Sequence, residues 1–461
     1  MSLIKRVIDS RRRSHRRERT RAILTTASVL WGLSASAAIL TAGAQDRATS
    51  GQSLRLGELY DEAQRDSPRV AAARALASAA EARVSSAKLP PDPQLQLGFM
   101  NYTLPGLRPM DPLGMVQLQL MQMLPVAGKL GLSGRVASFQ ASAQAERVRA
   151  VQWELRSDVA MAFYDLYQTD QRLAVMRETL GLLQDIRRTA EAMYRVGEGR
   201  QADVLRAQVE IARMVEDTVR MTTMRTGMAA RLDALLDRPG RESWPSPALP
   251  AFPDSVPSMD SLVSLAETGR PMLRAGERDL QAADAQASLA RREIWPDVTI
   301  GLQYGTQSGE MGTERMGSLM VGASVPVFAG RRQLRMREET DAMRKMAAAD
   351  LAAMHAETRA RVTEAYASLT RARNLAALYR TTVIPQAEAT AASSLAAYRV
   401  GGVDFMTLLD NRMTVNTYRQ ELFTLDAEQG KAWADLEMLV GRELFDANSV
   451  AGEARLTREK P

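Results

Sequence analysis

The chain contains one sequence unit twice. Tyr194-Arg195-Val196-Gly197 recurs as Tyr398-Arg399-Val400-Gly401, 204 residues later. Pro93 matches Pro296 at a distance of 203 residues, and Tyr164 matches Tyr366 at a distance of 202. Two copies of a unit of about 200 residues therefore replace the three ordinary domains that a length of 461 residues would suggest. Both the fold and the function have to be explained by this unit.

Each copy is predicted to run helix, strand, strand, long helix, tight turn, helix. The first copy occupies residues 45–236, with helices at 54–88, 130–196 and 203–236 and strands at 94–99 and 116–120. The second copy occupies residues 259–445, with helices at 259–292, 331–400 and 405–440, strands at 298–304 and 319–325, and a loop at 306–317. A linker with six prolines, 237–258, separates the copies, and a polar, poorly ordered tail, 446–461, ends the chain.

The predicted strands alternate between apolar and small or polar residues. In the second copy, Val298, Ile300, Leu302 and Tyr304 point to one side, whereas Thr299, Gly301 and Gln303 point to the other. This pattern is typical of a half-buried sheet in water, and it is also typical of a membrane barrel. The alternation alone leaves both readings open.

The long helices exceed the length of helices in ordinary globular domains. Residues 130–196 contain no proline, and at 1.5 Å per residue they would form a rod of about 100 Å. Residues 331–400 contain only Pro385 and give a similar length. Because isolated helices of this length need partners, coiled-coil packing is expected.

The first 44 residues resemble an export signal. A stretch rich in arginine precedes the apolar run 22–40, and Ala42-Gly43-Ala44 supplies the small residues of a cleavage site. A retained membrane anchor is the alternative, since the apolar run is long enough to span a bilayer. This segment also holds the excess charge: outside it, 51 basic and 52 acidic residues remain, so nothing in the composition favours nucleic-acid binding.

The residue inventory argues against an enzyme. The chain has no cysteine and only two histidines, His15 and His355, which leaves no histidine-based triad and no metal site of the usual zinc type. No cofactor is expected, and His355 is assigned no role.

Methionines are frequent around the first strand pair. They are Met100, Met110, Met115, Met121 and Met123. Thioethers bind Cu(I), but methionine also fills gaps in apolar packing. Adjacent strand positions face opposite sides, so the five are not expected to line one site; we interpret them as packing residues.

Four strands per chain cannot close a barrel, and open sheet edges are not tolerated in lipid. If the strands span a membrane, several chains must pool them. Three copies would provide twelve strands, enough for an open pore, and their paired helices would continue that pore as a tube. The predicted fold is thus mostly α: a long helical coiled-coil barrel, with four strands per chain joining a trimeric twelve-stranded transmembrane β-barrel.

Several motifs together resemble the TolC-type outer-membrane efflux proteins, including their heavy-metal branch. They are Ser53-Leu54-Arg55-Leu56-Gly57-Glu58-Leu59 before Ser67-Pro68, Gln122-Met123-Leu124-Pro125-Val126-Ala127-Gly128-Lys129, Ser324-Val325-Pro326-Val327-Phe328-Ala329-Gly330-Arg331, and the two Tyr-Arg-Val-Gly turns. The resemblance covers residues 53–441. It implies a homotrimer in outer-membrane lipid with a long periplasmic extension. It also implies two partners, a periplasmic adaptor (membrane fusion) protein and an inner-membrane pump of the RND type.

The resemblance also assigns the site residues. It places the two turns at the periplasmic tip, where the adaptor docks, and the residues carried over are Tyr194, Val196, Gly197, Tyr398, Val400 and Gly401. The alternative is that the turns only reverse the chain. Asp203 matches an aspartate of the entrance ring in some members, and it could equally be a helix-start residue; Val403 stands where those members have a basic partner.

Two alternatives to a small-molecule exit duct remain. The first is a duct for type I protein secretion, which needs the same conduit. The second is an exported periplasmic coiled-coil scaffold or adaptor whose strands form a small sheet in water. Detergent-dependent trimers in the outer membrane would exclude the scaffold.

Overall fold

The computed structural model describes residues 53–449, except for residues 104, 111–113, 241–243 and 310–311. The predicted signal peptide and all of the C-terminal tail beyond Ser449 lie outside the described residues. Among the helices of the described part, none combines the length and the apolar character needed to cross a membrane.

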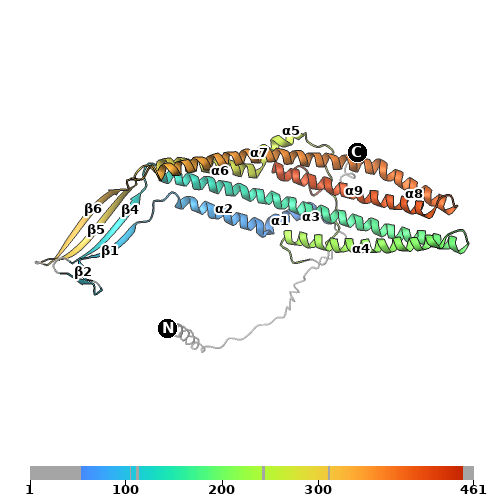
Figure 1. The fold of residues 1–461 in the computed structure, drawn as a ribbon, viewed down its shortest axis with the longest axis horizontal. Helices are drawn as coiled ribbons and strands as arrows, with labels where there is room; N and C mark the ends of the chain where they lie inside the picture. Colours follow the sequence, from blue (N-terminus) through green and yellow to red (C-terminus); the bar gives the residue numbers. More distant parts are fainter. Residues whose placement is uncertain (1–52, 104, 111–113, 241–243, 310–311, 450–461) are drawn as a thin grey trace, which may run out of the picture. The chain divides into compact units, whose positions relative to one another are not determined.

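The predicted order of elements is found in both copies, except that each predicted first helix is divided into two helices, before Pro68 and before Pro271 (Figure 1). The first copy consists of α1 (Leu56–Asp66), α2 (Pro68–Ser86), β1 (Gln94–Met100), β4 (Met115–Leu124), α3 (Lys129–Arg195) and α4 (Gln201–Leu235). The second consists of α5 (Met259–Gly269), α6 (Pro271–Arg292), β5 (Val298–Gly309), β6 (Gly312–Ala323), α7 (Gln333–Leu378), the π-helix η1 (Tyr379–Val383), α8 (Ile384–Arg399) and α9 (Phe405–Val440). A small ribbon, β2 (Tyr102–Thr103) with β3 (Arg108–Pro109), lies in the loop of the first hairpin.

The second hairpin is longer than predicted. The segment 306–317 was expected to be a loop because it is rich in glycine and polar residues. Instead β5 continues to Gly309 and β6 begins at Gly312, and the pairing runs without interruption between them. Glycine and polar side chains weaken the alternation signal, but they do not prevent the backbone hydrogen bonds that define a strand. At its other end, β6 stops at Ala323, two residues before the predicted end.

The long helix of the second copy is interrupted, in contrast to the uniform rod that was predicted. The π-helix η1 separates α7 from α8 just before Pro385, which lacks an N–H and cannot continue a regular helix without adjustment. The offset between the copies grows from 202 residues at Tyr366 to 204 at Tyr398, so the second copy holds two extra residues here. A π-helical turn accommodates such additional residues without ending the helix.

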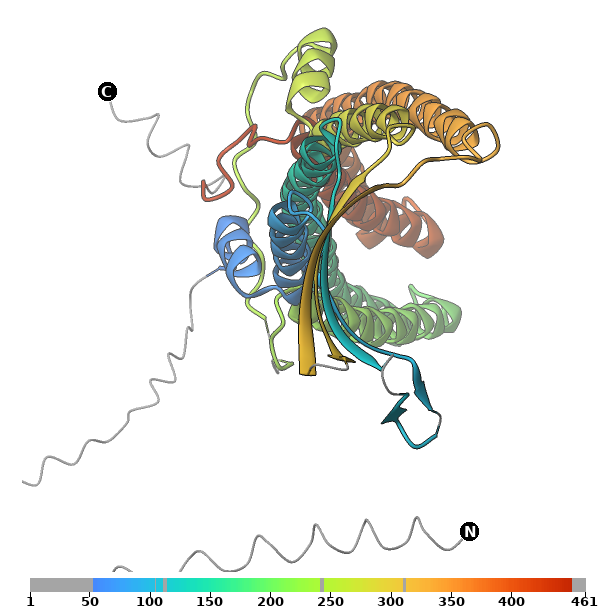
Figure 2. The same ribbon diagram turned by 90° about the vertical axis from the view of Figure 1, so that its left-hand side faces the viewer.

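The four longer strands form one antiparallel sheet with the order β1-β4-β5-β6. The centre of the sheet joins the two copies, because β4 of the first pairs with β5 of the second, with Leu124 opposite Val298. In the described part of the chain, β1 and β6 each pair on one side only and are the edges of a curved, open sheet (Figure 2).

The main core lies where α9 packs against α3. Its largest fully buried side chains include Trp433, Tyr164 and Phe163. A side chain at Gly430 would overlap the ring of Tyr164, so close helix packing requires glycine there. The proline-rich segment between the copies is part of this core through Phe252, whose ring centre lies 6.3 Å from that of Tyr164.

A buried charged pair fixes α3 to α9. Arg156 on α3 contacts Glu437 on α9 at 3.4 Å, and both side chains are almost completely buried. Burial raises the pKa of Glu437, while hydrogen bonds from the backbone N–H groups of Leu444 and Phe445 and the charge of Arg156 act in the opposite direction. These contacts tie the chain after α9 back onto the helices, and Ser449 accepts a hydrogen bond from Ala251 of the linker.

Candidate functional site

The two faces of the sheet differ in chemistry. The register of the four strands places Leu97, Leu118, Tyr304 and other apolar residues on one face. Most of these apolar side chains are exposed: Leu95, Leu97, Phe99, Leu118, Leu120, Ile300, Leu302, Tyr304, Leu319 and Val321. An exposed patch of this kind is rare on a protein that faces water on all sides and marks a lipid or protein contact.

The opposite face is lined by glutamine, glycine, threonine, serine and methionine. Gln303 donates a hydrogen bond to Gln117 on β4 and accepts one from Ser318 on β6, which links three strands on this face. Met121 and Met320 flank Gly301, where a side chain would contact both. The register confirms the prediction that Leu302 and Gln303 lie on opposite faces of the sheet.

Four of the five methionines share this polar face, but the five do not line one site, as expected. Met100 lies directly opposite Met115, and Met121 and Met123 follow on the same side of β4 because they are separated by even numbers of residues. Met115 and Met121 are nevertheless about 20 Å apart at 3.3 Å per residue, so they cannot form one metal site. Among the described residues, no group of three histidine, aspartate or glutamate side chains could hold a metal ion either.

A buried lysine marks the junction between the sheet and the helices. Lys129, the first residue of α3, donates hydrogen bonds from Nζ to the backbone oxygen of Trp295 at 2.9 Å and to Oδ1 of Asp297 at 2.8 Å. Glu293 lies 3.6 Å away. The lysine belongs to the first copy and its partners to the second, so this contact joins the two copies at the point where β5 begins.

The two Tyr-Arg-Val-Gly turns lie at the end of the helices opposite the sheet (Figure 1). Gly197 has φ +81° and Gly401 has φ +71°, as predicted for residues that end a helix. The N–H of Gly199 bonds to the carbonyl of Met193, and the N–H of Gly402 bonds to the carbonyl of Ala397, which closes each turn. Val196 and Val400 are 71% and 82% exposed, and side chains this apolar and this accessible suit contact with a partner.

The two turns differ in how they hold their tyrosines. Tyr398 is buried and packs edge-on against Phe405, with 5.8 Å between the ring centres. Tyr194 is 47% exposed, and the position that corresponds to Phe405 in its copy is Gln201. The turns also start their second helices differently. Asp404 caps α9 by accepting hydrogen bonds from the hydroxyl and the backbone N–H of Thr407, which lower the pKa of Asp404, whereas Arg200 provides no side-chain cap for α4.

Asp203 lies in the first turn of α4, where an acidic side chain favours the helix dipole. This position suits the helix-start role that was one of its two predicted readings. Burial raises the pKa of Tyr398, and the negative charge of Asp203 raises it further. The Asp203 carboxylate of the first copy therefore acts on the turn of the second copy. Val403 is half-buried in the apolar core of the tip.

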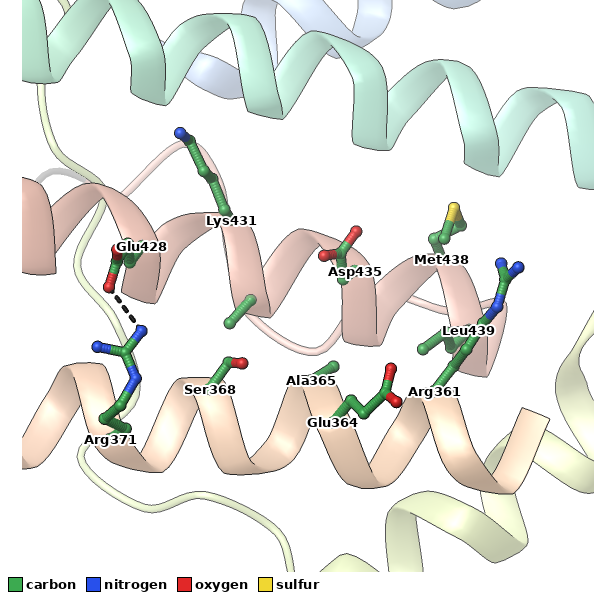
Figure 3. A pocket seen from close by; sticks show the side chains of 11 residues that line it. Arg361, Glu364, Ala365, Ser368, Arg371, Glu428, Lys431, Asp435, Met438 and Leu439 are labelled. Carbon is green, nitrogen blue, oxygen red and sulfur yellow. Dashed lines mark hydrogen bonds and ion pairs between the residues drawn. The ribbon is translucent and has the colours of Figure 1, made fainter. Parts of the chain in front are cut away.

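A groove of about 510 Å³ lies between α7 and α9 (Figure 3). Its charged residues are balanced: Arg361, Arg371, Lys431, Glu364, Glu428 and Asp435. Arg371 pairs with Glu428 at 2.8 Å, and Lys431 points away to Asp165 on α3. The pairs of Arg371 and Lys431 thus join α9 to α7 and to α3. His355 is half-buried in α7.

The outer membrane efflux protein family matches residues 59–238 and 262–442, one match for each copy of the unit. The chain belongs to the outer membrane efflux protein family. Among curated relatives, the probable efflux pump outer membrane protein SepC of Pseudomonas putida is 28% identical over 272 residues, which are 54% of this chain and 54% of the relative. The outer membrane efflux protein BepC of Brucella suis is 27% identical over 236 residues, 49% of this chain and 50% of the relative. The chain thus spans about half the length of the curated relatives it matches.

Solved structures show the same fold. The outer-membrane channel OprN aligns with a TM-score of 0.72 at 18% identity, covering 84% of this chain and 89% of that one. VceC of Vibrio cholerae aligns with a TM-score of 0.71 at 17% identity, covering 85% and 97%. CusC aligns with a TM-score of 0.73 at 18% identity, covering 84% and 92%. The predicted family and fold are confirmed.

The unequal burial of the two tyrosines generates a prediction for the tip. Tyr398→Ala removes a buried ring and should destabilise the α8–α9 hairpin by about 3–5 kcal/mol, whereas Tyr194→Ala should change stability by less than about 0.5 kcal/mol. Hydrogen exchange of the tip amides measures both. Tyr398→Phe is the matched control: it keeps the ring and removes a hydroxyl that has no hydrogen-bond partner in the described structure, so exchange should stay near wild type. Equal exchange in the two alanine variants would contradict the assigned asymmetry.

Proposed function

We propose that this protein is the outer-membrane exit duct of a tripartite efflux system, which passively conducts substrates from an inner-membrane pump and a periplasmic adaptor to the exterior. The observation that carries the proposal is the four-stranded sheet, which has an exposed apolar face, a polar face and two edges that are unpaired among the described residues. Family membership supports the same role. In this role the protein performs no chemistry of its own.

The sheet supports placement in a membrane. The exposed leucines and valines suit contact with hydrocarbon, and the glutamine-rich face suits a water-filled lumen. Backbone groups at an open edge have no water to bind within a bilayer, so β1 and β6 need partners from other chains. Three chains would pool twelve strands, and their helices would continue the lumen into the periplasm.

The same face argues against the scaffold alternative. A sheet of an exported scaffold would stand in water, where an apolar surface built from ten large side chains on one face would favour aggregation. A protein-secretion duct requires the same conduit as a small-molecule duct. In both cases the attached pump selects the cargo, so we assign the passive conduit to this chain and the substrate choice to its partner.

We assign adaptor docking to the exposed residues of the tip. The turns present Val196 and Val400 at the far end of the helices, where the α3–α4 and α8–α9 hairpins end side by side in one apolar cluster. Tyr194 adds a half-exposed ring to the first turn, whereas Tyr398 serves the internal packing of the second. An adaptor that packs its own helical hairpins against these tips would cover the exposed valines and seal the junction between the two proteins.

The membrane assignment predicts opposite environments for neighbouring residues of β5. A labelled cysteine at Leu302 should be quenched by a lipid-soluble quencher, and one at Gln303 by a water-soluble quencher, because the two side chains leave opposite faces of the sheet. The cysteine-free background allows each label to be placed singly in purified protein reconstituted into liposomes. Equal quenching at both positions would contradict a membrane-spanning strand.

If the adaptor docks at the turns, changes in the turns should abolish efflux without preventing assembly of the chains in the outer membrane. Gly197→Val and Gly401→Val force a β-branched residue into positive φ, at a cost of about 1–3 kcal/mol. The added side chains meet open space, so the change is confined to the turn. We expect normal outer-membrane assemblies that no longer support tolerance to a pump substrate.

Gly181→Val in α3 is the matched control, since its side chain also meets open space but the backbone is helical. It should retain full efflux. If the two turn variants and their double mutant export like the wild type, adaptor docking is not at these turns. If the assembly itself is lost, the turns are structural.

A further inference from the structure

A groove of about 530 Å³ lies between the first part of α3 and the last part of α6, beside the point where β4 ends. Two arginines line it, Arg135 on α3 and Arg292 on α6, together with Gly128, which precedes α3. Both arginines are exposed, and within the described part of the chain neither guanidinium group makes an ion pair. Two unpaired cations in one groove favour an anionic ligand.

The other charges of the groove do not cancel these two arginines. Asp284 is the one acidic residue among the described residues of the lining, and it lies 3.5 Å from Arg344 of α7. The N-terminus of α3 adds to the positive field, because its first N–H groups point toward this end and its N-cap, Gly128, provides no side-chain cap. A Cβ atom added at Gly128 or Gly131 would meet open space, so an anion can approach the start of the helix.

On α3, the groove lies toward the outer side of the layer of helices. Arg156 marks that side, since its guanidinium group lies 3.9 Å from the ring centre of Tyr60 in α1, and α1 covers the convex side of the curved layer (Figure 2). At 3.6 residues per turn, Arg135 lies about 60° around α3 from Arg156, whereas Arg147 lies about 180° from it. Arg135 therefore faces outward, and Arg147 faces the concave side.

The same geometry holds on α6. Arg147 pairs with Asp279, which places this aspartate toward the concave side of α6. Arg292 lies about 220° around α6 from Asp279, so it is turned toward the convex side. In a tube built from such curved layers the concave side lines the lumen, and the groove between Arg135 and Arg292 is open to the surroundings of the tube.

The groove lies at the level of lipid headgroups when the sheet spans a bilayer. β5 has twelve residues, about 40 Å of extended chain, which covers about 30 Å of hydrocarbon at the usual tilt of such strands. Arg292 ends α6 six residues before β5 begins. Arg135 lies about 9 Å beyond the start of α3, and its side chain points back toward the sheet, because helical side chains tilt toward the N-terminus. Both guanidinium groups therefore lie just beyond the hydrocarbon.

We propose that this groove binds the phosphate of an anionic phospholipid from the periplasmic leaflet, with Arg135 and Arg292 as the binding residues. Guanidinium groups bind phosphate oxygens through paired N–H groups, and the N-terminus of α3 favours the same charge. A zwitterionic phospholipid carries an ammonium group beside its phosphate, which two unpaired arginines repel, so a lipid of net negative charge is preferred. The site rests on the proposed duct, because it requires the sheet to span a membrane, and it adds the class of lipid held at the periplasmic end of the sheet.

Native mass spectrometry of the detergent-purified assembly tests the site, because it counts bound lipids. We expect phosphatidylglycerol to bind more tightly than phosphatidylcholine. Arg135→Gln combined with Arg292→Gln should weaken the binding of phosphatidylglycerol about fivefold for each arginine removed and leave that of phosphatidylcholine unchanged. Arg135→Lys combined with Arg292→Lys keeps both charges and should retain most of the binding.

Arg177→Gln combined with Arg231→Gln is the matched control. Both arginines are exposed and make no ion pair within the described residues, and they lie on α3 and α4 away from the sheet (Figure 1). This variant loses the same charge and should bind phosphatidylglycerol like the wild type. An equal loss of binding in the control would mean that net charge alone attracts the lipid, which would overturn the groove as its site.

Inorganic phosphate distinguishes a lipid site from a general anion site. At constant ionic strength, an excess of phosphate should displace little phosphatidylglycerol, because the acyl chains add to the binding of the lipid. Complete displacement by phosphate would overturn the assignment to a lipid. Equal binding of the two phospholipids, or binding of phosphatidylglycerol that survives the two glutamine substitutions, would overturn the site itself.

The quenching of labelled cysteines at Leu302 and Gln303 separates this site from the proposed duct. If the lipid-soluble quencher reaches only the label at Leu302 and the anionic lipid is not preferred, the sheet spans a membrane and the lipid site is wrong. Equal quenching at the two positions overturns both.

Discussion

Two rows of backbone groups at the edges of the sheet constrain the rest of this protein. A four-stranded antiparallel sheet satisfies the hydrogen bonds of β4 and β5 internally, but in the described part of the chain β1 and β6 each retain one free side. In water such edges could be solvated, yet the large apolar side chains on one face make water the wrong environment for this sheet. In lipid the edges have no alternative partner except another strand. The combination of an apolar face and open edges therefore requires more than one chain.

Duplication of the unit explains how one chain can provide its own neighbour. The first copy already packs on the second through β4–β5 and through Lys129 with Asp297, so each chain carries one complete contact of the kind that has to recur around a closed barrel. The copies have also diverged where their tasks differ. Tyr398 has Phe405 as a packing partner and is buried, whereas Tyr194 has no such partner and is exposed, so the two turns offer different surfaces at the tip.

Features set by local sequence could be predicted, and features set by distant contacts could not. Glycines at 197 and 401 end helices, and the alternation in residues 298–304 correctly assigned the faces of β5. The extension of β5 to Gly309 was not predicted, because it is stabilised by backbone pairing with β6 and is not marked by alternating apolar and polar side chains. The partner of Lys129 lies 168 residues away, which no local pattern reveals. By contrast, the asymmetry of the tip was readable in principle, since Gln201 stands where the second copy has Phe405.

The central claim is that the sheet is completed by other chains, and the mass of the purified assembly tests it most directly. Light scattering in detergent, with the contribution of the detergent subtracted, should give the mass of three chains, because three sheets of four strands make a barrel wide enough for a pore. The mass should not change on dilution if the edges of β1 and β6 are paired between chains. A stable, folded monomer with its sheet intact would contradict the account.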